Sequence, residues 1–336
     1  MKAFIFGAGA SKGAQELLEP LRPESIAPLI NELFDNRYQT YADGILTADQ
    51  FKQCQEGAAS GRFEEWLTER WENIAQLSPK NVAAEKAFFA GIAFFLWNLL
   101  THVTNGTRPA HGYQALLKKL LQANENFALI SFNYDTLLDR AVQGVFETSL
   151  TTLASYQKFG LIKPHGSINW ILPKRISDPD IRNNSFEYAQ RLLLAKEHMF
   201  QDEQHQMARV EIYPPDSPRL GNLSYLIDNL GYCYPLIFMP LTSKQYDTVD
   251  TFANSVISSG KDWLRQADEI YMIGYRANDE IIKELLSVVP QGTTLHVVDR
   301  SQSGAEEIMT SVLGWSTLQR GQIFGDGFVN FVNTYR

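Results

Sequence analysis

The chain has 336 residues, of which 44% are hydrophobic and 20% are charged, and its net charge is −8. This composition is typical of a folded protein, and the length suits one large domain or two ordinary ones. The acidic balance gives the chain no overall attraction to nucleic acid or to an anionic membrane, so we expect neither as a direct partner. Cys54 and Cys233 are the only cysteines. They cannot build a four-cysteine zinc site, and we expect no metal.

The chain opens with a short apolar run, Lys2–Phe6, that stops at a glycine turn, residues 7–11. The run is too short for the apolar core of a secretory signal, so we expect a cytoplasmic protein. It is typical of a buried parallel strand. Glycines after such a strand let the backbone approach a phosphate, and the next helix can direct its N–H groups at the anion. A tight turn without a ligand also explains the pattern, because the usual Gly-x-Gly-x-x-Gly spacing is absent.

Residues 36–124 carry a helical pattern with no strand alternation. Apolar residues recur there at three-to-four-residue spacing, for example at Phe63, Trp66, Leu67, Trp71 and Ile74. We therefore predict an all-helical insertion within a discontinuous domain made of residues 1–35 and 125–336. The most apolar stretch, Phe88–Leu100, falls short of the roughly 18 residues of a membrane-spanning helix. We expect it to be a buried helix at a domain or subunit interface.

Strands and helices alternate after the insertion. Short apolar runs predict strands at Phe127–Ser131, Leu161–Lys163, Ile168–Leu172, Leu236–Met239, Glu269–Ile273 and Thr294–Val298. Helices are expected at Leu137–Val142, Ile176–Val210, Val249–Gln266 and Ile281–Val288. This alternation predicts an α/β fold, with a Rossmann-like parallel sheet that helices cover on both faces.

Polar residues follow several of these strands, at the ends where parallel sheets bind ligands. Asn133 and Asp135 are placed to orient a water or to hold a carboxamide, although Asp135 also stands where a helix N-cap belongs. His165 lies in a Pro-His-Gly turn. It is either a general base near neutral pH or a structural hydrogen-bonding residue. Asp299, at the end of a late strand, suits a ribose hydroxyl, but like Asp279 it is also a candidate helix cap.

Four motifs occur in a fixed order. They are Gly-Ala-Gly-Ala-Ser at 7–11, Ser-Phe-Asn-Tyr-Asp at 131–135, Lys-Pro-His-Gly-Ser-Ile-Asn-Trp at 163–170 and Ile-Gly-Tyr-Arg-Ala-Asn-Asp at 273–279. With these motifs the chain resembles the SIR2-like domains of the bacterial, sirtuin-related kind, in particular the NAD hydrolases of antiphage defence.

The resemblance implies a Rossmann-like sheet that binds NAD, and it implies a role for each motif. The diphosphate would lie on Gly7, Ala8, Gly9 and Ser11, and the nicotinamide ribose and carboxamide on Asn133 and Asp135. His165 would be the general base, Gly274 and Tyr275 would approach the adenosine, and Asp299 would meet its ribose.

The departures from the family bear on the reaction. Classical sirtuins carry a four-cysteine zinc ribbon, which this chain cannot build, and a Pro-Asp-Phe-Arg-like segment where Gln15–Leu18 stand here. We therefore predict an NAD glycohydrolase. The alternatives are a zinc-free deacylase or ADP-ribosyltransferase, and a non-catalytic subunit that senses NAD or another nucleotide.

Control of such an enzyme is expected in trans. After the last predicted elements only Gly314–Arg336 remains, which is too short for a sensor domain. We expect regulation by a partner protein or by homo-oligomerisation. The candidate surface consists of aromatic residues of the insertion, which equally suit its own core: Trp66, Trp71, Phe94, Phe95 and Trp97.

Overall fold

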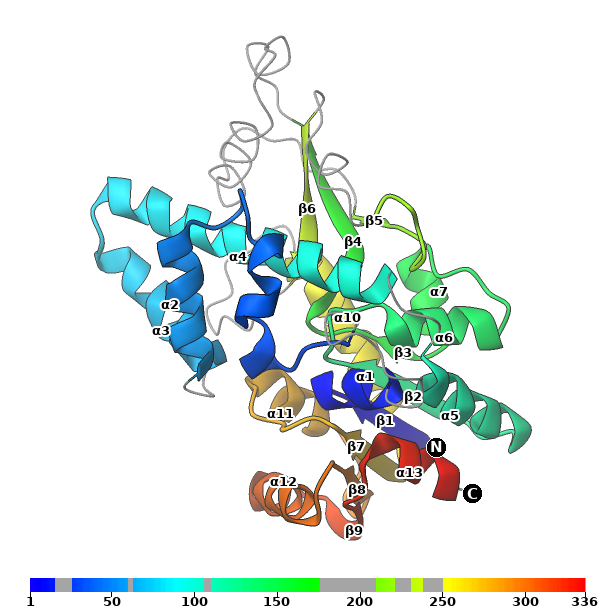
Figure 1. Cartoon of the computed structure of the whole chain (residues 1–336). Coiled ribbons are helices and arrows are strands. Elements are labelled where there is room, and N and C mark those ends of the chain that lie inside the picture. The colour runs from blue at the N-terminus through cyan, green and yellow to red at the C-terminus, as the bar shows by residue number, and fades with distance from the viewer. Residues whose placement is uncertain are drawn as a thin grey trace.

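A computed structural model describes most of the chain (Figure 1). The described residues are 1–15, 26–59, 63–105, 110–175, 210–220, 231–237 and 250–335. The strands are β1 (Lys2–Phe6), β2 (Phe127–Ser131), β3 (Leu161–Ile162), β4 (Gly166–Arg175), β5 (Glu211–Ile212), β6 (Gly231–Ile237), β7 (Glu269–Ile273), β8 (Thr294–Val298) and β9 (Gln319–Phe324). The expected helix Ile176–Val210 lies, except for its last residue, outside the described residues.

Helices connect the strands and fill the expected insertion. They are α1 (Ala8–Gln15), α2 (Ala48–Ala59), α3 (Phe63–Glu72), α4 (Pro79–Asn105), α5 (His111–Gln122), α6 (Leu137–Val145), α7 (Leu153–Lys158), α10 (Asp250–Leu264), α11 (Glu280–Leu286), α12 (Gln302–Trp315) and α13 (Gly327–Thr334). Short 3-10 helices occupy Ile30–Glu32, Asn36–Tyr41 and Asn73–Gln76.

The main sheet has six strands in the order β3-β2-β1-β7-β8-β9, and every neighbouring pair is parallel. This is the 3-2-1-4-5-6 order of dinucleotide-binding Rossmann folds. Strand β1 lies at the centre of the sheet, so its Ala3–Phe6 segment is fully buried on both faces, as an uninterrupted apolar run predicts. The predicted Rossmann-like parallel sheet is confirmed.

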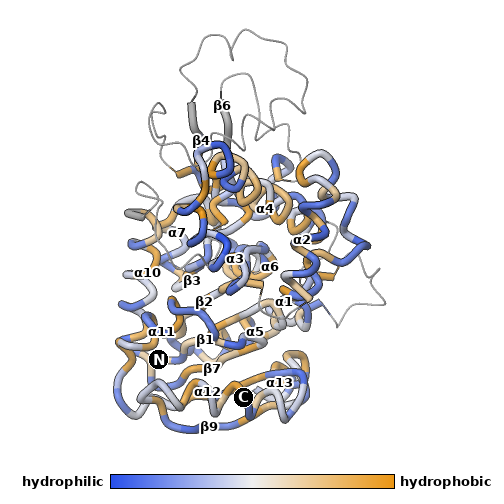
Figure 2. Tube along the Cα trace, turned by 90° about the vertical axis from the view of Figure 1, so that its left-hand side faces the viewer, coloured by the Kyte–Doolittle hydropathy of each residue, from blue (hydrophilic) through white to orange (hydrophobic). Residues whose placement is uncertain are grey.

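Two groups of helices cover this sheet. Helices α1, α5, α6 and α13 pack with one another, while α10 packs against α11, and α12 packs against β8 and β9. Right-handed crossovers that run in opposite directions from β1 place these groups on opposite faces. Figure 2 shows apolar residues along the strands and along α4, which lies above the sheet.

Two strand predictions were wrong in their pairing. Strands β4 and β6, which contain Ile168–Leu172 and part of the expected Leu236–Met239, form a separate antiparallel sheet with β5. The chain leaves the main sheet at Gly166, whose φ of 79° turns it away after β3. Strand β9 was not expected, because this edge strand is largely exposed and carries no apolar run.

The aromatic residues proposed as a partner surface instead form core. Phe94, Phe95 and Trp97 are fully buried in α4, Trp71 is buried and Trp66 is half-buried. In α4, 27 residues long, the expected stretch Phe88–Leu100 is only the central part. By length and composition α4 is able to cross a membrane, yet 83% of its most apolar 18-residue window is buried inside the protein. Because α5 packs on α1, α6 and α13, the boundary of the insertion at residue 124 stays a prediction.

Candidate functional site

The site is built at the carboxyl ends of β1 and β7, where the strand order reverses direction. Gly7 and Gly274 follow these neighbouring strands, and their turns cross closely. The Gly9 N–H donates to the Gly274 carbonyl over 3.1 Å. A Cβ on Gly7 would lie 2.5 Å from the Gly274 oxygen, and one on Gly274, at φ 57°, would lie 2.3 Å from the Ala10 nitrogen. The close crossing of the two turns therefore requires glycine at positions 7 and 274. The binding of a diphosphate by residues 7–11, including Ala8, stays a prediction.

Asn133 is anchored to the glycine turn. Its amide nitrogen donates to the Gly7 carbonyl over 2.8 Å and to Ser11 Oγ over 2.9 Å. A carbonyl oxygen only accepts, so the atom facing Gly7 must be Nδ2 and both amide hydrogens are used. These two contacts use the amide nitrogen and leave the amide oxygen Oδ1 as an acceptor. This oxygen is therefore the atom that is left to bind a water or a hydroxyl.

Tyr113 completes the support of Asn133. Its hydroxyl lies 3.0 Å from Ser11 Oγ, and the whole side chain is buried. Burial raises the pKa of the Tyr113 hydroxyl well above its usual value, so the group stays protonated. Tyr113 was missed in the sequence because it lies on α5, where it fits the apolar helical pattern.

Asp135 is buried and closes the first turn of α6. Its Oδ1 accepts a hydrogen bond from the Leu137 N–H over 3.0 Å, two residues further on, as in an Asx turn. Burial raises the pKa of Asp135, while the Lys163 ammonium opposes that shift. Asp135 is therefore not the N-cap of α6, because Thr136 takes that position, but it bonds the first N–H of the helix from one residue earlier. A contact of Asp135 with nicotinamide stays a prediction.

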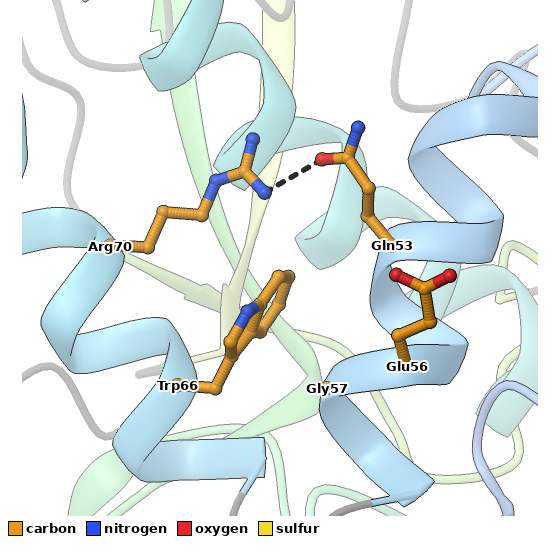
Figure 3. A pocket seen from close by; sticks show the side chains of 5 residues that line it. All are labelled: Gln53, Glu56, Gly57, Trp66 and Arg70. Atoms are coloured by element: carbon orange, nitrogen blue, oxygen red, sulfur yellow. Dashed lines mark hydrogen bonds between the residues drawn. The ribbon is translucent and has the colours of Figure 1, made fainter.

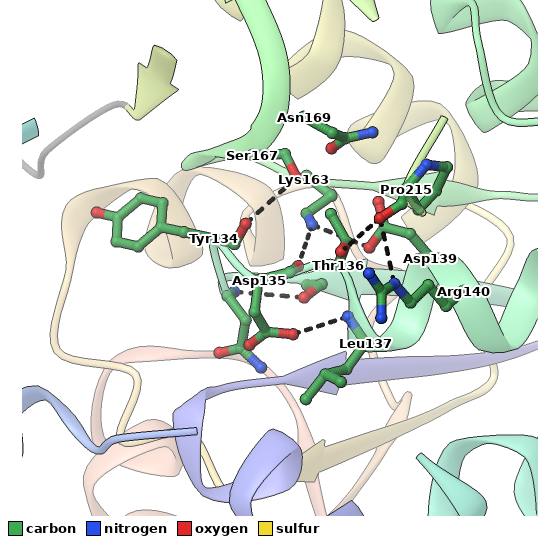
Figure 4. A network of polar contacts seen from close by, with 12 residues as sticks. Tyr134, Asp135, Thr136, Leu137, Asp139, Arg140, Lys163, Ser167, Asn169 and Pro215 are labelled. Atoms are coloured by element: carbon green, nitrogen blue, oxygen red, sulfur yellow. Dashed lines mark hydrogen bonds and ion pairs between the residues drawn. The ribbon is translucent and has the colours of Figure 1, made fainter. Parts of the chain in front are cut away.

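A buried polar network joins this turn to the histidine turn (Figure 4). Lys163 Nζ donates to the Asp135 carbonyl over 2.6 Å and lies 2.9 Å from Asp139 Oδ2, and both charged side chains have no exposed surface. The Tyr156 hydroxyl donates to Asp139 Oδ1 over 2.7 Å and accepts from Asn169 Nδ2 over 2.9 Å. The network fixes the turns after β2 and β3 relative to each other.

His165 lies in this second turn, and its side chain is only 4% exposed. Its ring lies 4.9 Å from the Phe132 ring and 6.0 Å from the Tyr134 ring, between ring centroids. These two residues flank Asn133 in the chain, so the structure brings Asn133 and His165 to the same place. Burial lowers the pKa of His165, although Asp279 and a hydrogen bond to the Phe132 backbone oppose the shift. The imidazole is therefore neutral at pH 7, as a general base must be.

Asp279 lies beside His165, and Tyr275 contacts both Asp279 and Phe132. The Tyr275 ring stacks on Phe132, with centroids 4.4 Å apart and planes 14° apart, and its hydroxyl donates to Asp279 Oδ2. Asp279 Oδ1 accepts from the Ile282 N–H over 3.0 Å, which confirms it as the N-cap of α11. The predicted approach of Gly274 and Tyr275 to adenosine is not tested by these contacts.

Asp299 stands at the end of β8, away from the histidine turn. It is not the cap of α12, because Ser301 takes that position and accepts from the Gly304 N–H over 3.1 Å. Asp299 Oδ1 accepts from the Ser301 N–H over 3.3 Å instead. Its contact with a ribose stays a prediction.

A separate pocket of about 430 Å³ lies between α2 and α3 (Figure 3). It is lined by Gln53, Glu56, Gly57, Trp66 and Arg70. Arg70 is engaged there, since it donates to Gln53 Oε1 over 2.7 Å and pairs with Glu85. No predicted site residue lines this pocket.

Comparison with known proteins gives structural matches alone. No protein-family model matches the sequence, and no match to a curated protein is found. The chain is similar to a sirtuin structure from a study of sirtuin substrate affinity, with 13% identity over 99% of this chain and 91% of that one and a TM-score of 0.43. It is also similar to a structure from a study of the mechanism and regulation of Sir2 enzymes, with 13% identity, 100% and 93% coverage and a TM-score of 0.37. Both belong to the family that the four motifs resemble. At these TM-scores the likeness carries no inference about chemistry, for which the side chains described above are the basis.

Proposed function

We propose that this protein is an NAD glycohydrolase, which cleaves the bond between nicotinamide and ribose to give nicotinamide and ADP-ribose. The observation that carries the proposal is the anchored amide of Asn133. Both of its N–H bonds are held by the glycine turn, so its oxygen points to a fixed place at the switch point of a Rossmann sheet. A neutral, buried histidine stands beside the residues that flank this amide.

The chemistry requires little beyond positioning. Nicotinamide leaves with the electron pair of the C–N bond, and the ribose carbon passes through an oxocarbenium-like state. Asn133 Oδ1 accepts a hydrogen bond from the attacking water and so fixes the direction of its lone pair. As the water oxygen bonds to the ribose carbon, His165 Nε2 accepts the proton that the water loses and later releases it to solvent. The products are nicotinamide, ADP-ribose and one proton.

We further propose that the activity is switched on by a partner protein or by self-assembly, as in a defence effector that depletes NAD. Support comes from the burial of the site: Asn133 is 7% exposed and His165 is 3% exposed. An unrestrained NAD hydrolase would also be toxic to its own cell.

The test is chromatography of NAD after incubation with the protein, alone and together with the products of neighbouring genes. Asn133→Ala and His165→Ala are expected to lower nicotinamide release by at least about 100-fold, the usual contribution of a positioned base. Asn330→Ala and His102→Ala, at exposed positions, are matched controls that keep the wild-type rate. Thermal unfolding of each variant checks that the fold is retained.

Three results would contradict the proposal. If both site variants cleave NAD like wild type, the residue assignment is wrong. Nicotinamide release only in the presence of an acylated or acceptor protein would favour the deacylase or transferase alternative. Calorimetric binding of NAD without turnover under any of these conditions would favour a sensing subunit.

A further inference from the structure

We propose that Asp279 is a positioning residue for His165, which holds the imidazole in place and stabilises the positive charge that it gains during NAD cleavage. This inference rests on the proposed function. Asp279 Oδ2 lies 3.5 Å from His165 Nε2, and the two side chains are 9% and 4% exposed. Nε2 has no hydrogen-bond partner among the described residues. The carboxylate therefore lies beside the atom that must accept a proton.

Asp279 cannot easily turn away from the histidine. Its Oδ1 is held by the Ile282 N–H at the start of α11, and its Oδ2 is held by the Tyr275 hydroxyl. The Tyr275 ring is stacked on the Phe132 ring. The Phe132 ring in turn packs edge-to-face against the His165 ring. Each member of the set is thus fixed by the next one.

The two ring nitrogens of His165 have different roles. The ring hydrogen-bonds to the Phe132 backbone, and because Nε2 has no such partner, Nδ1 is the donor. This fixes the tautomer whose lone pair is on Nε2. When Nε2 takes a proton from the attacking water, the resulting imidazolium lies 3.5 Å from the Asp279 carboxylate. A neutral imidazole gains little from that carboxylate, whereas an imidazolium gains a charge-assisted contact in a buried site.

The other ionisable groups around this pair act on Asp279 as well. Tyr275 donates its hydroxyl, the Tyr134 ring stacks on His165, and the carboxyl of Glu64 on α3 repels Asp279. Burial and the Asp279 charge raise the pKa of Glu64 to about 7. Protonation of Glu64 removes this repulsion of the Asp279 charge.

The experiment combines NAD cleavage with a carbon-13 NMR titration of the histidines. Asp279→Asn keeps an oxygen for the Ile282 N–H, since asparagine caps helices as well as aspartate does, but it removes the charge. We expect the pKa of His165 to fall, the acid limb of the cleavage rate to move to lower pH, and kcat to drop at least about tenfold with little change in KM. His296, which lies 3.7 Å from Glu269, serves as an internal reference whose titration stays unchanged.

Two further variants separate positioning from stability. Thr152→Ala removes the N-cap of α7, an exposed cap that accepts from the Ser155 N–H over 3.1 Å, and is expected to keep wild-type cleavage. Tyr275→Phe frees Asp279 Oδ2 from its hydroxyl, so the pKa of His165 should rise. If Asp279→Asn does not fold, this opposite shift still tests the contact.

The two hypotheses fail in different ways. A wild-type protein that cleaves no NAD under any condition refutes the hydrolase, and the titration still decides whether Asp279 acts on His165. A wild-type protein that cleaves NAD, with an unchanged His165 titration and pH profile in Asp279→Asn, refutes the positioning role.

Discussion

The buried ion pair between Lys163 and Asp139 gives the sharpest prediction about folding. Neither side chain has any exposed surface, and Lys163 Nζ also donates to the Asp135 carbonyl. Replacing Lys163 by Met keeps the volume but leaves the Asp139 charge with the Tyr156 hydroxyl and without its ammonium partner. Breaking a buried pair in this way costs about 3–5 kcal/mol, because the remaining charge has lost its solvent and its partner. Urea denaturation of Lys163→Met should show this loss as a lower midpoint.

Two variants make this prediction specific. Lys261→Met removes a surface pair with Glu284, whose side chains are 25% and 41% exposed, and should cost less than about 1 kcal/mol. The double variant Lys163→Met with Asp139→Leu removes both charges and should recover most of the loss. A Lys163→Met protein as stable as Lys261→Met would refute the reasoning, because it would mean that Asp139 is not charged or not buried.

Two other predictions concern the glycine crossing and the histidine. Gly274→Ala should lower the free energy of unfolding by about 1–3 kcal/mol, because its Cβ would lie 2.3 Å from the Ala10 backbone nitrogen. The control Gly314→Ala, whose Cβ would meet nothing within 4 Å, should stabilise α12 slightly. A Gly274→Ala protein as stable as Gly314→Ala would overturn the close approach of the two turns. The lowered pKa of His165 means that the unfolded chain binds its proton more readily, so stability should fall as the pH drops through about 6.5. Urea denaturation at pH 7.5 and 5.5 should show a smaller difference for His165→Gln than for wild type, and an equal difference would contradict the assignment.

The part of the fold that the sequence predicts well is the buried part. Strands β1, β2, β7 and β8 begin and end where their apolar runs do, because strands covered on both faces consist of almost uninterrupted apolar residues. The edge strand β9 has no such signal, since Gln319, Arg320 and Gln322 face solvent or a half-covered surface. Pairing is harder still, because a short run such as Leu236–Met239 does not specify whether its partner is parallel or antiparallel.

The candidate site was predictable where it follows strands and not where it depends on contacts between distant segments. Asn133 and His165 could be named because each one follows a strand of the sheet. Tyr113 fits the apolar pattern of its helix, so its contact with Ser11 could not be predicted. Asp279 was interpreted as a helix cap, so the contact of its other carboxylate oxygen with His165 was not predicted. The reason is separation in sequence: Asp279 and His165 are more than 100 residues apart, and only the folded sheet brings them together.

The central position of β1 has a consequence for the synthesis of the protein. One edge of β1 pairs with β2 and the other with β7, which begins at residue 269. At about 5–20 residues per second, β7 follows β1 from the ribosome after roughly 13–53 s. During that interval the fully apolar segment Ala3–Phe6 keeps an open hydrogen-bonding edge, which invites pairing with another chain. We therefore expect the yield of soluble protein in cells to depend on how this edge is shielded, by chaperones or by slow growth at low temperature, more than on the stability of the finished fold.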